Sequence, residues 1–164
     1  MGIEIERKFI VSKEKAAEYD SLADEGKYGY HEIEQAYLTT EPVIRVRKTD
    51  DKYSMTYKGK GLLQREEYNL PLTKEAYETL VSKADGNVIR KRRIIIPFDK
   101  YIIELDIFKE PFDSFIIAEV EFDSVDIADS FTPPEWFLEE VTNDSKYHNS
   151  HMSRMTFKKG ENHG

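Results

Sequence analysis

The sequence predicts a mainly β (α+β) domain in which antiparallel strands form a barrel or a sandwich. Short segments of alternating apolar and polar residues recur along the chain and are separated by tight turns, which is typical of such folds. Several of these segments carry charges on one face, and most of these faces have charges of a single sign. The 164 residues suffice for one domain with a buried core, and no linker or repeat divides them. We therefore expect a single domain over residues 1–164.

The first strand shows the alternation most clearly. Glu4, Glu6 and Lys8 alternate with apolar residues and Arg7, so they share one face of the strand. Neighbours in such a row are about 6–7 Å apart, and carboxylates this close repel each other unless a cation lies between them. Mg²⁺ and Mn²⁺ are hard cations that take such oxygen ligands. A half-buried strand with a wet polar face is the simpler interpretation of this strand taken alone.

The other strands follow from the same alternation and from the turns between them. Residues 49–51 and 98–100 are typical of hairpin turns. We expect strands over residues 3–11, 32–38, 43–48, 52–58, 65–72, 88–97, 101–108 and 115–122.

Capping residues predict the helices. Ser12 can cap a helix that runs to about Glu25, with Gly26 as its stop, and Thr73 can cap a second helix over residues 74–84. Pro134 suits the first turn of a short helix. We expect shorter helices over residues 125–130, 134–140 and 149–159, and fraying of the last five residues.

The charged rows recur in pairs that are sorted by sign. If the sheet closes with these rows inside, it forms a tunnel with an acidic zone for metal ions and a basic zone for oxyanions, and the apolar rows pack under helices outside. The alternative is a set of unrelated, solvent-facing rows. The acidic pairs are Glu4/Glu6, Glu104/Asp106 and Glu119/Glu121, and the basic or polar pairs are Arg45/Arg47, Thr56/Lys58 and Lys91/Arg93.

Acids and bases together indicate a polyanion bound through metal. Arginine binds phosphate oxygens in pairs, and lysine acts as a point charge. The run Lys58-Gly59-Lys60-Gly61 lacks the spacing and the Ser/Thr of a P-loop, so side chains would hold the phosphates. The matching chemistry is metal-assisted phosphoryl transfer, in which one metal bridges the phosphates and a second activates a water.

Composition excludes several other classes of protein. The formal charge of −8 argues against general nucleic-acid binding, and the absence of cysteine excludes disulfides and thiolate chemistry. The N-terminus has no apolar signal region, and no apolar run is long enough to span a membrane. We expect a cytoplasmic protein with no membrane or nucleic-acid partner.

The ordered motifs resemble those of the CYTH superfamily, the triphosphate tunnel metalloenzymes. Glu4-x-Glu6-x-Lys8 is similar to the family's ExExK signature, and further motifs follow in the family's order to about residue 150. These are Arg45-x-Arg47, Thr56-x-Lys58, Arg65-Glu66-Glu67, Lys91-x-Arg93, Glu104-x-Asp106, Glu119-x-Glu121 and the run from Glu140 to Asn149.

The resemblance implies a closed eight-stranded antiparallel β-barrel, or tunnel, with a charged interior and helices packed outside. It implies hydrolysis of tripolyphosphate, longer polyphosphate or nucleoside triphosphates with Mg²⁺ or Mn²⁺, through two ions, and a segment over about residues 134–160 that closes one tunnel mouth. The implied metal ligands are Glu4, Glu6, Glu104, Asp106, Glu119 and Glu121. The implied phosphate-binding residues are Lys8, Arg45, Arg47, Lys52, Lys58, Lys91, Arg93 and Lys146. The implied catalytic residues are Glu4, Glu6, Lys8, Glu119 and Glu121.

Several alternatives stay open at this point. A class IV-type adenylate cyclase would use the same site with a ribose hydroxyl as nucleophile, and a non-catalytic polyphosphate-binding module would need only the bases. The inward side chain among residues 65–67 is undetermined. We expect packing roles for Tyr28 and Trp136, a surface position for His148 and His151, and a monomer or homodimer.

Overall fold

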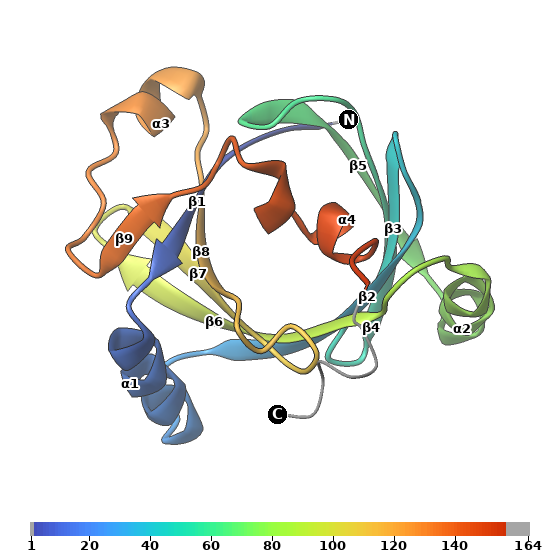
Figure 1. Cartoon of the computed structure of the whole chain (residues 1–164), viewed down its shortest axis with the longest axis horizontal. Helices are drawn as coiled ribbons and strands as arrows, with labels where there is room; N and C mark the ends of the chain where they lie inside the picture. The colour runs from blue at the N-terminus through green and yellow to red at the C-terminus, as the bar shows by residue number, and fades with distance from the viewer. Residues whose placement is uncertain (1, 157–164) are drawn as a thin grey trace.

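A single antiparallel sheet closes on itself to form the body of the protein (Figure 1). The computed structural model describes residues 2–156. In that part of the chain the strand order is β5-β4-β3-β2-β6-β7-β8-β1-β9, and an additional pairing of β5 with β1 closes the ring. The predicted closed barrel of eight antiparallel strands is thereby confirmed, and β9 is added beside β1.

Strands β1 to β8 match the predicted segments closely, and β9 was not predicted. Their bounds are β1 Gly2–Val11, β2 Tyr30–Thr40, β3 Val43–Thr49, β4 Lys52–Lys58, β5 Gln64–Leu72, β6 Ile89–Phe98, β7 Tyr101–Phe108, β8 Ile116–Glu121 and β9 Phe137–Glu140. The helices are α1 Lys13–Asp24, α2 Lys74–Lys83, α3 Val125–Ser130, the 3₁₀ helix η1 Ser145–Tyr147 and α4 Asn149–Met152.

The helix caps form as the sequence predicts. The Ser12 side chain accepts a hydrogen bond from the Lys15 amide at 3.2 Å, and Thr73 accepts one from the Ala76 amide at 3.1 Å. Each cap satisfies an amide that the first helical turn leaves without a partner. Gly26 follows α1 with a φ of +81°, a conformation that glycine adopts without strain.

The apolar rows face outward and are covered by helices. Ala36 and Val46 pack with Tyr77 of α2, and Phe9 and Val120 belong to the larger core cluster on the opposite side. Figure 1 shows α1, α2 and α3 outside the ring, whereas α4 lies over its interior. Because side chains alternate along a strand, covering the apolar rows from outside turns the charged rows inward.

The predicted helix over residues 134–140 is wrong, because Phe137–Glu140 form strand β9. β9 pairs with Phe9–Val11, the part of β1 that extends beyond its pairing with β5. The free edge of β1 would otherwise leave backbone groups without partners. Phe137 also packs on Phe9, with 4.7 Å between ring centroids.

The final helix is shorter than predicted. α4 ends at Met152, whereas the sequence predicted a helix to residue 159. The predicted end of that helix, residues 157–160 of the predicted closing segment and the last five residues lie outside the described part of the chain. No helix within residues 2–156 is long and apolar enough to cross a membrane.

Phe131 provides a test of the outer core. Its ring is 4% exposed and contacts the rings of Phe9, Phe98, Tyr101 and Phe122. We expect Phe131→Ala to lower the free energy of unfolding by about 3–5 kcal/mol in urea denaturation, because it leaves a cavity. Leu138→Ala is the control, because Leu138 is 65% exposed and its loss should change stability by less than about 0.5 kcal/mol. Equal effects of the two substitutions would contradict this packing.

Candidate active site

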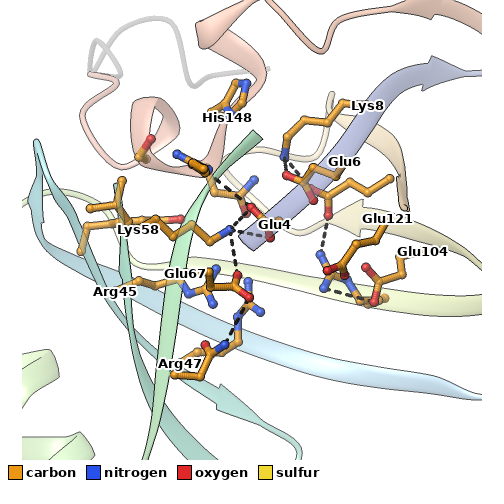
Figure 2. A pocket seen from close by; sticks show the side chains of 18 of the residues that line it. Glu4, Glu6, Lys8, Arg45, Arg47, Lys58, Glu67, Glu104, Glu121 and His148 are labelled. Carbon is orange, nitrogen blue, oxygen red and sulfur yellow. Dashed lines mark hydrogen bonds and ion pairs between the residues drawn. The ribbon is translucent and has the colours of Figure 1, made fainter. Parts of the chain in front are cut away.

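The inward charged rows line a cavity of about 200 Å³ inside the barrel (Figure 2). Carboxylates come mainly from β1, β7 and β8, and basic side chains come mainly from β3, β4 and β6. The lining residues are Glu4, Glu6, Lys8, Tyr37, Val43, Arg45, Arg47, Lys58, Arg65, Glu67, Asn69, Lys91, Arg93, Glu104, Glu119, Glu121, His148, Asn149 and Ser150.

Strand register sets the acidic wall. Glu6 is paired with Glu121 across β1 and β8, and Glu119 is paired with Glu104 across β8 and β7. Directly paired residues point to the same side of a sheet, so four carboxylates crowd one wall of the tunnel. Lys8 is the neighbour of Glu119 in the same register and forms an ion pair with it. Although burial opposes it, this contact raises the pKa of Lys8 and keeps the amine charged.

The basic wall holds two arginines that lack a full set of partners. Arg45 donates from Nη2 to Thr56 Oγ1 at 3.0 Å, but its buried Nε has no hydrogen-bond partner among the described residues. Arg47 donates from Nε to Gln35 Oε1 at 2.8 Å. Burial, together with repulsion from Arg45 and Arg93, lowers the pKa of Arg47 to about 9. A bound anion would satisfy the free donor and relieve this repulsion.

A buried salt-bridge network joins the two walls. Arg93 donates to Asp106 from Nε at 2.7 Å and from Nη2 at 2.9 Å, and Nη2 also lies 2.7 Å from Glu119 Oε2. Lys91 Nζ is 2.7 Å from Asp106 Oδ2 and 2.9 Å from Asn149 Oδ1. Burial lowers the pKa of Lys91 to about 7, although Asp106 acts in the opposite direction. Asp106 therefore orients Lys91 and Arg93 from behind the cavity wall.

Excess negative charge collects at Glu104 and Glu121. The side chain of Glu121 has no hydrogen bond or ion pair within residues 2–156, and burial with repulsion from Glu4 and Glu6 raises its pKa to about 7. Glu104 lies 3.5 Å from Arg93 Nη1, and its pKa is nevertheless raised, chiefly by burial. Crowded carboxylates such as these are the oxygen donors that a hard divalent cation prefers.

The acidic wall fits a divalent cation, but its carboxylates are not gathered for one. In the described part of the chain no three acidic or histidine side chains surround a common point closely enough to hold an ion. Glu4 is held by Lys58 Nζ at 2.9 and 3.0 Å, and Glu119 is held by Lys8 and Arg93. A bound ion would therefore require these carboxylates to exchange their ammonium and guanidinium partners.

Most of the predicted site residues lie together in the cavity, but three do not line it. Lys52 has the correct strand phase but is the exposed first residue of β4, beyond the cavity. Lys146 lies in η1, and its exposed Nζ is 3.7 Å from Asp144. Asp106 is 1% exposed and sits behind Lys91 and Arg93.

The expected inward row of Lys91 and Arg93 is observed in β6. Arg90 and Arg92 form ion pairs on the outside of the barrel, with Glu34 and Glu32 respectively.

The sequence did not identify several lining residues. Arg65, Glu67 and Asn69 of β5 form an inward row with a spacing of two, and its pairing with β4 would have revealed the phase. His148, expected at the surface, is 4% exposed and its Nε2 lies 3.1 Å from the Thr142 carbonyl oxygen. Tyr28 and Trp136 pack against Tyr19, as expected.

Comparison with known proteins identifies the family. A model of the CYTH domain matches residues 2–153. The chain belongs to the CYTH domain family. It is 35% identical over 155 residues to an inorganic triphosphatase of Nitrosomonas europaea, covering 92% of this chain and 96% of that protein. It is also 35% identical over 161 residues to an inorganic triphosphatase of Acetivibrio thermocellus, covering 96% of this chain and 97% of that protein.

Solved structures agree with this CYTH assignment. The crystal structure of an inorganic triphosphatase is similar with a TM-score of 0.64 and 31% identity, covering 93% of this chain and 99% of that one. A candidate adenylyl cyclase from Hippeastrum, described as having a dominant triphosphatase activity, has a TM-score of 0.58 at 16% identity, covering 77% of this chain and 82% of that one. At that identity the likeness shows the CYTH fold alone.

The crowding of carboxylates around Glu121 predicts that the natural protein and a Glu121→Gln variant differ in stability, in metal-free buffer, by an amount that depends on pH. A carboxyl whose pKa is raised in the folded state keeps its proton after the unfolded chain has lost it, so its contribution to stability falls from about pH 4.5 to pH 7. We expect Glu121→Gln to gain stability relative to the natural protein across this range and to level off above it. Urea denaturation with EDTA at several pH values measures the difference. A difference that is constant with pH would contradict the crowding.

Proposed function

We propose that this CYTH protein is a metal-dependent triphosphatase that hydrolyses tripolyphosphate, and that it also accepts longer polyphosphate or nucleoside triphosphates. Its curated relatives make it a hydrolase of phosphoanhydride bonds. The observation that carries the proposal is the separation of uncompensated charge in one cavity. The free Arg45 Nε and crowded Arg47 lie on the basic wall, and crowded Glu121 lies on the acidic wall. A polyanion together with a divalent cation is complementary to both walls.

The basic wall supports binding of three linked phosphates by side chains. Arg45, Arg47 and Arg93 present planar donor groups that pair with phosphate oxygens, and Lys58 and Lys91 add point charges. Arg45, Lys58 and Lys91 are buried, and Arg47 and Arg93 are half-buried, so their attraction for an anion is weakly screened by solvent. The groups are already positioned by the strands, which reduces the cost of arranging them when the substrate binds.

The acidic wall supports use of Mg²⁺ or Mn²⁺. When bound, such ions neutralise phosphate charge and lower the pKa of a coordinated water. Glu6, Glu104 and Glu121 would hold them, joined by Glu4 and Glu119 once Lys58, Lys8 and Arg93 turn to the phosphates. Lys8 is placed between Glu6 and Glu119, at 3.6 Å from Glu6 Oε1, so it is suited to contact both the carboxylates and a phosphate.

The acidic wall also argues for hydrolysis over simple binding. A module that only binds polyphosphate gains nothing from the six carboxylates that line the cavity, because they repel it. In hydrolysis the same carboxylates hold the cation that neutralises the developing charge.

Substrate and metal are tested together by phosphate release. We expect orthophosphate from tripolyphosphate with Mg²⁺ or Mn²⁺, and none with EDTA. Pyrophosphate, long polyphosphate, ATP and thiamine triphosphate are compared under the same conditions. Cyclic AMP and pyrophosphate from ATP, without orthophosphate, would identify a cyclase instead. Tight binding of tripolyphosphate without turnover under any metal would contradict the proposal.

Paired substitutions separate the roles of the two walls. We expect Glu6→Gln to lower kcat about 100-fold or more, because it replaces a charged carboxylate ligand of the charge-stabilising ion by a neutral amide. We expect Arg47→Ala to raise KM on the order of 10- to 100-fold, because it removes a charge-assisted contact to phosphate. Glu66→Gln and Arg90→Ala are matched controls on the outside of the same barrel and should leave both constants unchanged. Intact turnover in Glu6→Gln would rule out this role of the acidic wall.

A further inference from the structure

Two larger hollows adjoin the tunnel, and strand register places them at opposite ends of the barrel. Val43 at the start of β3 is paired with Lys58 at the end of β4, so the β2–β3 and β4–β5 connections share one end. β2 runs antiparallel to β6, so the end of β6 at Phe98 lies at the other end. Phe98 is paired with Tyr101, which begins β7 there.

The first hollow, which we name the basic mouth, has a volume of about 810 Å³. It lies between the β2–β3 turn, the β4–β5 loop and the C-terminal segment 145–154. Its charged lining groups are three cations, Lys60, Arg65 and Arg154, and one anion, Glu41. His148 and His151 add two further hydrogen-bond donors. Arg154 also forms an ion pair with Asp85 at 2.9 Å. The basic mouth shares Val43, Arg65, His148 and Ser150 with the tunnel cavity, so the two spaces adjoin each other.

The second hollow, which we name the acidic mouth, has a volume of about 530 Å³. Its charged lining groups are Glu104, Glu121 and Asp123 against Lys100. It shares Glu104 and Glu121 with the tunnel cavity. The two mouths therefore carry opposite excess charge: three fixed cations to one anion in the basic mouth, and three carboxyl groups to one cation in the acidic mouth.

We propose that the polyanionic substrate enters the tunnel through the basic mouth, between the C-terminal segment and the β4–β5 loop. A triphosphate at the acidic mouth meets three carboxyl groups and one amine, whereas at the basic mouth it meets Lys60, Arg65 and Arg154 against one carboxylate. Charged clefts of one sign concentrate an oppositely charged ligand and speed its association. Lys60 is thus a steering residue outside the groups that hold the reacting phosphates. This inference rests on the proposed function.

Plugging each mouth tests the route, because the chain has no cysteine of its own. Lys60→Cys and Lys100→Cys place one thiol at the basic and acidic mouth, both at exposed positions. Each variant is coupled to biotin-maleimide and then capped with streptavidin, and kcat/KM for tripolyphosphate is measured. This constant is insensitive to product release. We expect capping at residue 60 to lower it at least about tenfold and capping at residue 100 to change it less than about twofold.

Charge reversal gives a second measurement that needs no label. Lys60→Glu should lower kcat/KM about tenfold at low ionic strength with kcat unchanged, and the loss should shrink as salt is added. Lys100→Glu makes the same charge change at the other mouth and should have little effect. Larger losses at residue 100 than at residue 60, equal losses at both, or no loss at either would overturn the proposed route.

The unlabelled, unsubstituted protein separates failure of this route from failure of the proposed function. If it releases no phosphate from any polyanion with either metal, the proposed function fails. If it is active and the capped Lys60→Cys variant keeps full kcat/KM, the function stands and the route through the basic mouth is wrong.

Discussion

The buried ion pairs between the walls of the tunnel are the constraint on which the rest of the structure depends. Lys91 and Asp106 are each 1% exposed, and Arg93 links Asp106 to Glu119. A charge taken out of water must be paired, and removing one partner of such a pair costs about 3–5 kcal/mol. The barrel can therefore turn its charged rows inward only because acids and bases pair across it, in part through register, as Lys8 does with Glu119 and Arg93 with Asp106. The apolar rows are then left for the helices outside.

The same pairing leaves charge over at both sides of the cavity. The positive charge of Arg45 and Arg47 is not fully balanced by nearby carboxylates. The negative charge of Glu121 is likewise not balanced by nearby cations. A ligand that brings its own negative and positive charge, such as a phosphate chain with a divalent cation, relieves both excesses at once. Under the proposed function, binding would exchange internal ion pairs for contacts to the ligand, so the groups that pair within the barrel would also hold the substrate.

The sequence predicted the barrel because alternation determines which side chains share a face, and the acidic and basic pairs lie inside as that alternation requires. It did not predict features that depend on neighbouring strands. The phase of β5 at residues 65–67 depends on pairing with β4, and β9 forms because β1 has a free edge beyond β5. Strand phase alone predicted that Lys52 lies inside the barrel. Lys52 is the first residue of β4, however, and therefore lies beyond the end of the cavity. His148 reaches the cavity through a fold of the C-terminal segment that no local pattern encodes.

Diffraction from crystals grown with Mn²⁺ and tripolyphosphate, recorded for the anomalous scattering of manganese, tests the central claim most directly. The variant Glu6→Gln would slow turnover during growth of the crystals. We expect manganese peaks beside Glu104 and Glu121 inside the barrel, with phosphate density against Arg45 and Arg47. Manganese confined to the outer surface, or phosphate bound outside an empty tunnel, would contradict the assignment of the two walls.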